Sequence, residues 1–451
     1  MTVFNGKRVS NDVFKLDIER MRQGWYSDKY FANILMMLEG LSQQGRGYEG
    51  QYARDVGADP SSVQVGDIEV EVQFFTRRSG KTVVVGVDKA LAMLRHCTGY
   101  FDDHGEWVST WQNLEVTAVH DGAVVEYHGN PKRVQPVIKV YGRYRDFAML
   151  ETPMLGILSR SSRIATNVYN VLLAARGKSV LFFPARFDLH EVQAADGYAY
   201  DVAVARFNQD YGGQLRSYVS TDAQGDWWGG AGGGTIAHAA IACFLSDTAA
   251  TMLAFAEFVP ADVPRIALVD FNNDSLQDGL RTMEAMFVRY LPLIEAGKTE
   301  EAQKYVLFGV RLDTSGSQRD VSVPPLGDAV LDLGVTPRLV FNMRQALDSA
   351  WESWNLTPSQ VEIAREYCRN VRIVATGGFG PEKIRRFEKL QVPVDIFGVG
   401  SSLLSNDKET NTDFTADVVR VKIDGEWHDM AKIGRQASEN PDLAPVDLTD
   451  F

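Results

Sequence analysis

The chain has 451 residues, of which 45% are hydrophobic and 23% are charged, a composition typical of a soluble globular protein. This length favours two domains over one. A formal net charge of −13 at pH 7 argues against a general binder of nucleic acid or of anionic membranes. The three cysteines are far apart and form no CxxC pair, so neither a disulfide framework nor a structural zinc site is expected.

The segment 1–20 carries charges throughout and has no apolar centre, so it does not predict a signal peptide. No uncharged run approaches the roughly 20 residues that are needed to span a bilayer. We therefore expect a cytoplasmic protein without a membrane segment.

The first 150 residues mix helix and strand patterns without regular alternation, which predicts an α+β domain over 1–150. Apolar spacing predicts helices at 11–21 and 29–41. A strand pattern covers 68–76, and the segment 81–96 begins as a strand and continues as a helix. The segment 114–128 is predicted to form two strands of a hairpin that turns at Asp121-Gly122.

Beyond residue 150, short continuous apolar runs alternate with helix patterns, which is typical of a parallel sheet covered by helices. The predicted strands are 179–183, 265–269, 305–312, 371–374 and 394–397. The predicted helices are 159–176, 276–294, 337–354 and 381–390. We expect an α/β barrel domain over 151–410, followed at 411–451 by strands that return to the first domain, including a hairpin at 417–433.

Charged side chains lie at the C-terminal ends of several of these strands, where a barrel of this kind places its chemistry. They are Arg186, Asp270, Arg311 and Asp313. Glycine turns at 376–378 and 398–402 follow the last two strands, where a phosphate site is a recurrent barrel feature. A further glycine run at 229–234 precedes Thr235 and His238, at the start of an apolar helix pattern. Glycine allows backbone N–H groups to approach an anion, and an imidazole there could transfer protons or act as a nucleophile.

A Rossmann fold is the alternative for the strand–glycine–helix pattern. The spacing at 377–380 does not fit GxGxxG, and no acidic residue follows a second strand where that fold needs one. The barrel is therefore favoured.

Seven short motifs, in this order along the chain, resemble nicotinate phosphoribosyltransferase and the wider type II group that includes the nicotinamide and quinolinate enzymes. They span about 26–404 and are SDKY at 27–30, FPAR at 183–186, GTIAH at 234–238, VD at 269–270, GVRLD at 309–313, TGG at 376–378 and FGVG at 397–400. The resemblance implies an irregular α/β barrel joined to an α+β domain, and a homodimer with active sites shared between subunits.

The resemblance also implies a role for each matching residue. Tyr30 of the neighbouring subunit and Phe183 would stack on the two faces of a pyridine ring, and Arg186 would contact the base carboxylate or a phosphate. His238 would be phosphorylated by ATP. Asp270, Arg311 and Asp313 would act on the ribose and on Mg²⁺–pyrophosphate. The phosphate-binding set would be Thr235, Gly377, Gly378, Gly398, Gly400 and Ser401.

The implied reaction is phosphoribosyl transfer from phosphoribosyl pyrophosphate to nicotinate, with ATP as co-substrate. Mg²⁺ is expected to arrive with the substrate phosphates rather than at a site built by protein ligands. Neither nucleic acid nor a membrane is an expected partner.

Three departures from the family pattern leave alternatives open. The family motif GVRLDSGD stands here as GVRLDTSGS, so its second carboxylate is missing or displaced to Asp320. The family motif FGxRR has become FPARF, and the segment 190–233 has no match. The alternatives are another pyridine such as nicotinamide, or a protein that binds phosphoribosyl compounds without turnover and has a regulatory or structural role. Arg160 and Arg163, either substrate-reaching or surface residues, are left outside the predicted site.

Overall fold

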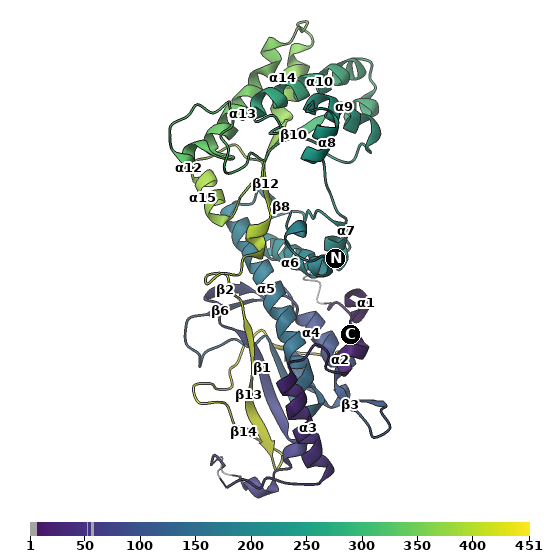
Figure 1. Cartoon of the computed structure of the whole chain (residues 1–451), viewed down its shortest axis with the longest axis vertical. Coiled ribbons are helices and arrows are strands. Elements are labelled where there is room, and N and C mark those ends of the chain that lie inside the picture. Colours follow the sequence, from purple (N-terminus) through teal and green to yellow (C-terminus); the bar gives the residue numbers. More distant parts are fainter. Residues whose placement is uncertain (1–6, 52, 56–57) are drawn as a thin grey trace.

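The computed structural model describes residues 7–51, 53–55 and 58–451. The molecule is elongated, with a six-stranded antiparallel sheet towards one end and a five-stranded parallel sheet towards the other. The long helix α5 (Glu151–Ala174) runs from the first sheet to the second (Figure 1). It contacts elements of both halves of the molecule: β2 (Gly80–Val83) and β13 (Phe414–Ile423), and also β8 (Ser179–Phe182), α6 (Gln193–Tyr211) and α15 (Pro381–Lys389).

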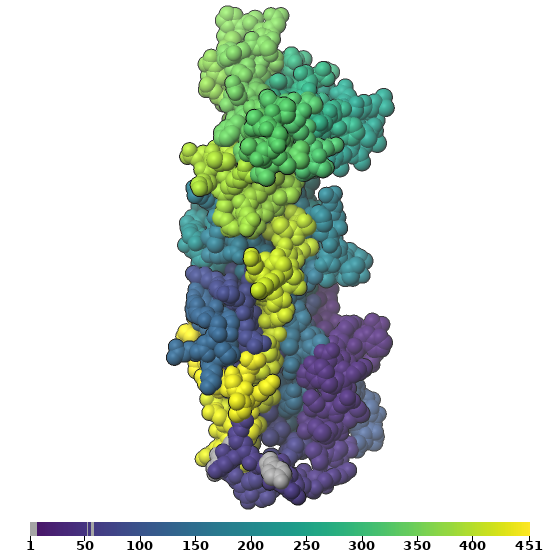
Figure 2. Space-filling model, turned by 60° about the vertical axis from the view of Figure 1, so that its left-hand side comes forward, coloured from purple at the N-terminus to yellow at the C-terminus, as the bar shows by residue number. Residues whose placement is uncertain are grey.

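The antiparallel sheet has the strand order β14-β13-β1-β7-β5-β15. Its strands are β1 (Glu69–Thr76), β5 (Glu115–Ala118), β7 (Ile138–Arg143), β13 (Phe414–Ile423), β14 (Glu426–Asp429) and β15 (Ala444–Pro445). Strand β13 pairs with both β1 and β14, so the predicted C-terminal hairpin forms and lies in the sheet of the N-terminal region. Figure 2 shows this C-terminal segment as a band along the N-terminal part.

Helices and two small ribbons complete this half of the molecule. The helices are α1 (Asn11–Phe14), α2 (Ile18–Arg22), α3 (Lys29–Gln43) and α4 (Val87–Cys97). The ribbons pair β2 (Gly80–Val83) with β6 (Val124–Tyr127), and β3 (Gly99–Phe101) with β4 (Trp107–Ser109). The single helix predicted at 11–21 is wrong, because Lys15 adopts a left-handed conformation that ends α1 and separates it from α2.

The hairpin predicted at 114–128 is also wrong. Strand β5 pairs with β7 and β15, whereas β6 pairs with β2. The buried Asp121 carboxylate accepts hydrogen bonds from the backbone N–H groups of Gly86 and Val87, at 2.8 Å each, where α4 begins. Asp121 therefore satisfies donors at a helix N-terminus instead of turning a hairpin.

The parallel sheet has the order β8-β12-β11-β10-β9, and all five predicted strands are present. Their bounds are β8 (Ser179–Phe182), β9 (Arg265–Leu268), β10 (Leu307–Leu312), β11 (Arg372–Ala375) and β12 (Ile396–Val399). The longer helices of this half are α6 (Gln193–Tyr211), α9 (Thr248–Phe258), α10 (Ser275–Glu295), α13 (Pro337–Ser349), α14 (Val361–Asn370) and α15 (Pro381–Lys389). The shorter ones are α7 (Asp222–Gly225), α8 (His238–Cys243), α11 (Thr299–Gln303) and α12 (Ala329–Asp332). The predicted α/β class is confirmed.

Parallel pairing continues beyond β8, at the edge of the five-stranded sheet. Phe182 bridges to Val219, and Val219 bridges to Gly232, each in parallel. Strand β9 is the opposite edge strand of the sheet, and Asp270 follows it. A hydrogen bond between His238 and Asp270 links the segment after Gly232 to the end of β9.

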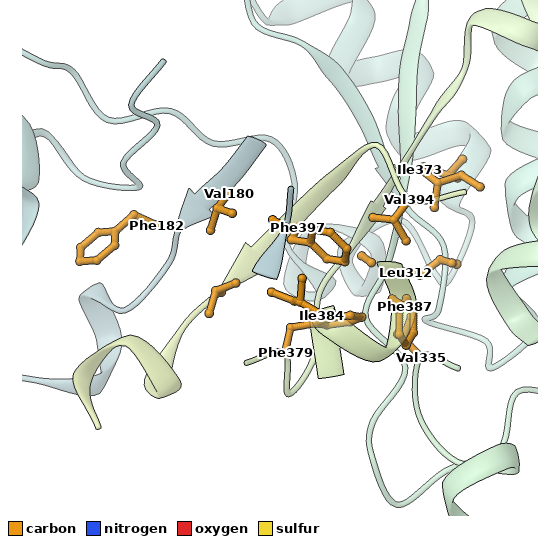
Figure 3. Packing of buried hydrophobic residues seen from close by; sticks show 14 of the residues in the cluster. Val180, Phe182, Leu312, Val335, Ile373, Phe379, Ile384, Phe387, Val394 and Phe397 are labelled. Atoms are coloured by element: carbon orange, nitrogen blue, oxygen red, sulfur yellow. The ribbon is translucent and has the colours of Figure 1, made fainter. Parts of the chain in front are cut away.

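A continuous apolar core lies between this sheet and its helices (Figure 3). Phe182 stacks on Tyr200 of α6 with ring centroids 4.8 Å apart. Phe379 packs against Phe387 of α15 and Phe397 of β12, at 5.0 and 5.4 Å. Burying rings of this size stabilises the fold by roughly 1.5–3 kcal/mol each, so the turn that contains Phe379 is held firmly against the sheet. Among the described helices, none is long and apolar enough to cross a bilayer.

Candidate active site

The carboxyl ends of the parallel strands bring several of the predicted residues to one edge of the sheet. Phe183 and Arg186 follow β8, Asp270 follows β9, and Asp313 follows β10. The glycine turns follow β11 and β12. Because neighbouring parallel strands end at the same edge, this arrangement follows from the topology of the sheet.

His238 and Asp270 form the first pair at this edge. The imidazole Nε2 lies 3.0 Å from Asp270 Oδ1. The Asp270 side chain is 9% exposed, and that of His238 is 46% exposed. Burial raises the pKa of Asp270, and the charge and hydrogen bond of His238 oppose that rise. The carboxylate therefore orients an imidazole whose remaining surface is open to a ligand.

Arg311 and Asp313, at the end of β10, form the second pair, with Nη2 3.8 Å from Oδ2. Burial lowers the pKa of Arg311, and the nearby carboxylates of Asp313 and Asp270 raise it again. Arg186 lies close enough to lower that pKa further. The buried Nε of Arg311 has no hydrogen-bond partner within the described part of the chain, so it can serve an anionic ligand.

The glycine turn after β11 is tied directly to Asp313. The Thr376 hydroxyl donates to Asp313 Oδ1 at 2.7 Å and to the Leu312 carbonyl at 3.0 Å. Gly377 has φ +85°, and a Cβ there would lie 3.3 Å from the same carboxylate oxygen. The absence of a side chain at this position lets the turn approach Asp313 closely.

Aromatic rings cover the end of β12. A Cβ at Gly398 would lie 2.9 Å from the Phe183 ring and 2.5 Å from the Thr376 methyl group. Both side chains therefore pack against this glycine and leave no room for a larger residue. A Cβ at Gly400 would lie 2.7 Å from the ring of Phe187, which is itself 5.3 Å from the Arg186 guanidinium carbon. Phe187 stands where the family motif FGxRR has its second arginine, and its contact with the second glycine turn was not predicted.

Lys383 is a second residue that the sequence reading missed. It lies in the first turn of α15, directly after the glycine turn, and its Nζ donates to the Gly377 carbonyl at 3.2 Å. The ammonium also lies 4.1 Å from the centre of the Phe379 ring. Burial lowers the pKa of Lys383 to about 8, and Arg386 adds to that effect. Lys383 could have been identified from the sequence by one signal: it is a lysine within the first turn of a helix that follows a glycine turn.

Other predicted residues are not joined to this cluster by any contact within the described ranges. Tyr30 is 55% exposed on α3, where its ring contacts Phe31. Thr235 is half-buried before α8, and Ser401 is exposed at the start of the turn after Gly400. Asp320 is fully buried and accepts hydrogen bonds from the backbone and hydroxyl groups of Ser275 and Ser322. Asp320 is therefore a structural residue and does not replace the missing second carboxylate.

The described residues contain no group of three metal-ligating side chains. Asp270 and Asp313 nevertheless present carboxylate oxygens at one edge, and such oxygens suit Mg²⁺ that arrives with phosphates. The donor set therefore fits a metal delivered by the substrate.

Comparisons with known proteins show which folds this chain resembles. Residues 59–162 match the family described as quinolinate phosphoribosyl transferase, N-terminal domain. The whole chain is similar to the crystal structure of nicotinate-nucleotide pyrophosphorylase from Pyrococcus furiosus, with a TM-score of 0.62 and 24% identity over 93% of this chain and 80% of that one. Human nicotinic acid phosphoribosyltransferase gives a TM-score of 0.53 and 16% identity, over 88% of this chain and 75% of that one.

No curated protein sequence matches the chain. The resemblance given by the seven motifs is confirmed by the family match and the similar structures, and the chain has the type II phosphoribosyltransferase fold. The residues at the carboxyl edge of its parallel sheet are therefore the candidate active site.

Proposed function

We propose that the protein transfers the phosphoribosyl group of phosphoribosyl pyrophosphate to nicotinate, giving nicotinate mononucleotide and pyrophosphate. The observation that carries this proposal is the convergence of Asp270, Arg311, Asp313 and the glycine turns at one edge of the sheet. Arginines at that edge favour a pyridine that bears a carboxylate, because a guanidinium binds a carboxylate through two hydrogen bonds.

In the proposed reaction, the bond between ribose C1 and the pyrophosphate oxygen breaks, and its electron pair leaves with pyrophosphate. The pyridine nitrogen supplies the pair for the new C1–N bond. Positive charge develops on the ribose ring, and the carboxylates of Asp270 and Asp313 stabilise it. Arg311 stabilises the departing negative charge, and Mg²⁺ bound to the substrate phosphates would screen that charge as well.

The ATP-coupled form of the proposal rests on phosphorylation of His238. Its Nδ1 is not engaged with Asp270, which holds Nε2. In this form the γ-phosphoryl group of ATP passes to an imidazole nitrogen, and ADP leaves with the bond electrons. Hydrolysis of the phosphohistidine then returns the free imidazole and inorganic phosphate.

The second candidate is a protein that binds phosphoribosyl compounds without turnover. It is favoured by the segment after Asp313, where the second carboxylate of the family motif is absent and Asp320 has a structural role. Turnover with phosphoribosyl pyrophosphate distinguishes the two candidates.

Replacing Lys383 by methionine should weaken binding of phosphoribosyl pyrophosphate by about tenfold or more, because a charged donor beside the glycine turn is lost. In the parent protein, affinity should fall as the pH rises through about 8, where Lys383 loses its proton. Calorimetric titration across this pH range measures both effects. Lys389→Met, at the far end of α15, is the matched control. Equal affinity in the parent and both variants would place the phosphate elsewhere.

The proposed assembly is a homodimer in which Tyr30 of one subunit enters the site of the other. Tyr30 lies on α3, which also exposes Met36 and Met37, and these apolar side chains suit a subunit interface. Tyr30→Ala and Asp313→Asn variants should each be nearly inactive. After subunit exchange, an equal mixture should recover about a quarter of the parent activity, because hybrid dimers hold one intact site. A mixture no more active than its components would exclude a shared site.

A further inference from the structure

Two arginine side chains, Arg78 and Arg163, lie near each other, and neither has a carboxylate partner among the residues that the structure describes. Arg78 follows β1 and is 7% exposed. Its Nη1 donates to the Thr412 hydroxyl at 2.7 Å, and its Nη2 donates to the Asn167 amide oxygen at 3.1 Å. Both acceptors are neutral, and Arg78 makes no ion pair with the described residues.

Arg163 lies on α5, one turn before Asn167. Its buried Nε has no hydrogen-bond partner among the residues that the structure describes, and its guanidinium forms no ion pair with them. Burial lowers the pKa of both arginines, and each is lowered further by a neighbouring arginine: Arg163 acts on Arg78, and Arg160 acts on Arg163.

The acidic groups around Arg163 do not neutralise it by direct contact. Asp188 and Asp196 are both bound to Arg160, at 2.7 and 2.8 Å. Asp413 acts on Arg163 only at longer range, as Asp407 does on Arg78. Burying a cation without a paired anion is costly, and two adjacent cations also repel each other. The positive potential around Arg78 and Arg163 therefore favours the binding of an anion between or beside them.

The pair also lies beside the candidate active site. Asn167, which holds Arg78, donates through Nδ2 to the carbonyls of Leu403 and Ser405 at 3.1 Å each, just after the second glycine turn. Arg160 lies one turn before Arg163 and binds Asp188. Asp188 stands in the loop that follows β8, close to Arg186 in the chain. The two arginines thus adjoin the loops that follow β12 and β8.

We propose that Arg78 and Arg163 form an anion subsite, separate from the glycine turns, that binds a phosphate group. Two guanidinium groups offer two positive charges and several N–H donors. This set matches a phosphate dianion better than it matches a carboxylate, which carries one charge and two oxygens. The phosphate group belongs either to a substrate or product of the proposed reaction or to free phosphate. In the first case this inference rests on the proposed function.

The test is a calorimetric titration of inorganic phosphate, at constant ionic strength, into five proteins: the parent, Arg163→Met, Arg163→Lys, Arg77→Met and Lys383→Met. Arg77 is the matched control because it neighbours Arg78 in the chain, is exposed, and donates from Nη2 to the Thr415 hydroxyl at 3.5 Å. Arg163→Met should bind phosphate at least about tenfold more weakly than the parent, while Arg77→Met stays within about twofold. Arg163→Lys should recover part of the affinity, because it restores the charge without the planar fork. The half-exposed Arg163 is chosen over Arg78 because loss of the more buried side chain endangers folding.

Phosphate affinity that is equal in the parent and Arg163→Met, or lost in Lys383→Met alone, would overturn the subsite, as would absence of binding to the parent. A parallel titration with phosphoribosyl pyrophosphate identifies the source of the phosphate. A matching loss of affinity in Arg163→Met assigns the subsite to the substrate, and unchanged affinity assigns it to free phosphate. Phosphate binding needs no turnover, so failure of the proposed reaction would leave this result interpretable.

Discussion

Replacing Asp313 by asparagine should lower kcat/KM for phosphoribosyl transfer by about two to three orders of magnitude. Asp313 faces Arg311 and receives the Thr376 hydroxyl hydrogen bond, so its charge lies where the ribose cation is proposed to develop. Asparagine keeps the acceptor for Thr376 and removes the charge, so the fold should persist. Steady-state kinetics with varied phosphoribosyl pyrophosphate measure the effect.

Asp274→Asn is the matched control for this prediction. Asp274 also lies in a loop after a strand of the same sheet, but its carboxylate caps α10 by accepting the Gln277 N–H at 3.2 Å. Asparagine is an equally good cap, so this variant should keep its activity. If Asp313→Asn retained the parent kcat/KM, the ribose charge would not develop beside Asp313.

Replacing His238 by alanine should abolish the stimulation of turnover by ATP. Some uncoupled transfer should remain, because Asp270 and Asp313 still lie where the ribose cation is proposed to develop. Loss of the imidazole also leaves the buried Asp270 carboxylate without its partner at 3.0 Å, which should cost roughly 1–3 kcal/mol of stability. Turnover with and without ATP, together with thermal unfolding, separates the two effects.

His190→Ala controls for the loss of an exposed imidazole, since His190 pairs with the neighbouring Glu191 and lies outside the candidate site. It should change neither ATP stimulation nor stability. A search for acid-labile phosphate on the parent protein adds a direct readout of phosphohistidine. ATP stimulation that persists in His238→Ala, without any acid-labile phosphate on the parent, would give His238 a purely structural role.

The parallel half of the fold could be predicted from sequence, because buried parallel strands are continuous apolar runs whose ends are marked by polar residues. Asp270, Arg311 and Asp313 were found in this way, and the topology of the sheet then brings them to one edge. The antiparallel half was harder to predict. The segments on either side of Asp121 look like the two strands of a hairpin, but each pairs with another strand, β7 or β2, and not with its neighbour.

Within the site, sequence identified residue types better than it identified contacts. Lys383 was missed because a lysine in a helix usually lies in solvent, and its contact with Gly377 depends on how Phe379 anchors the turn. Asp320 was a candidate because it is near Asp313 in sequence. Its carboxylate is instead held by Ser275 and Ser322, which only the folded chain reveals.

The most direct test of the proposed function is incubation of the protein with phosphoribosyl pyrophosphate, Mg²⁺ and ATP, with a panel of pyridines that includes nicotinate, nicotinamide and quinolinate. The products are identified by mass. We expect nicotinate mononucleotide and pyrophosphate, formed by the parent and almost absent with Asp313→Asn. Binding of phosphoribosyl pyrophosphate without a ribonucleotide of any pyridine in the panel would contradict the proposed transfer and support the non-catalytic alternative.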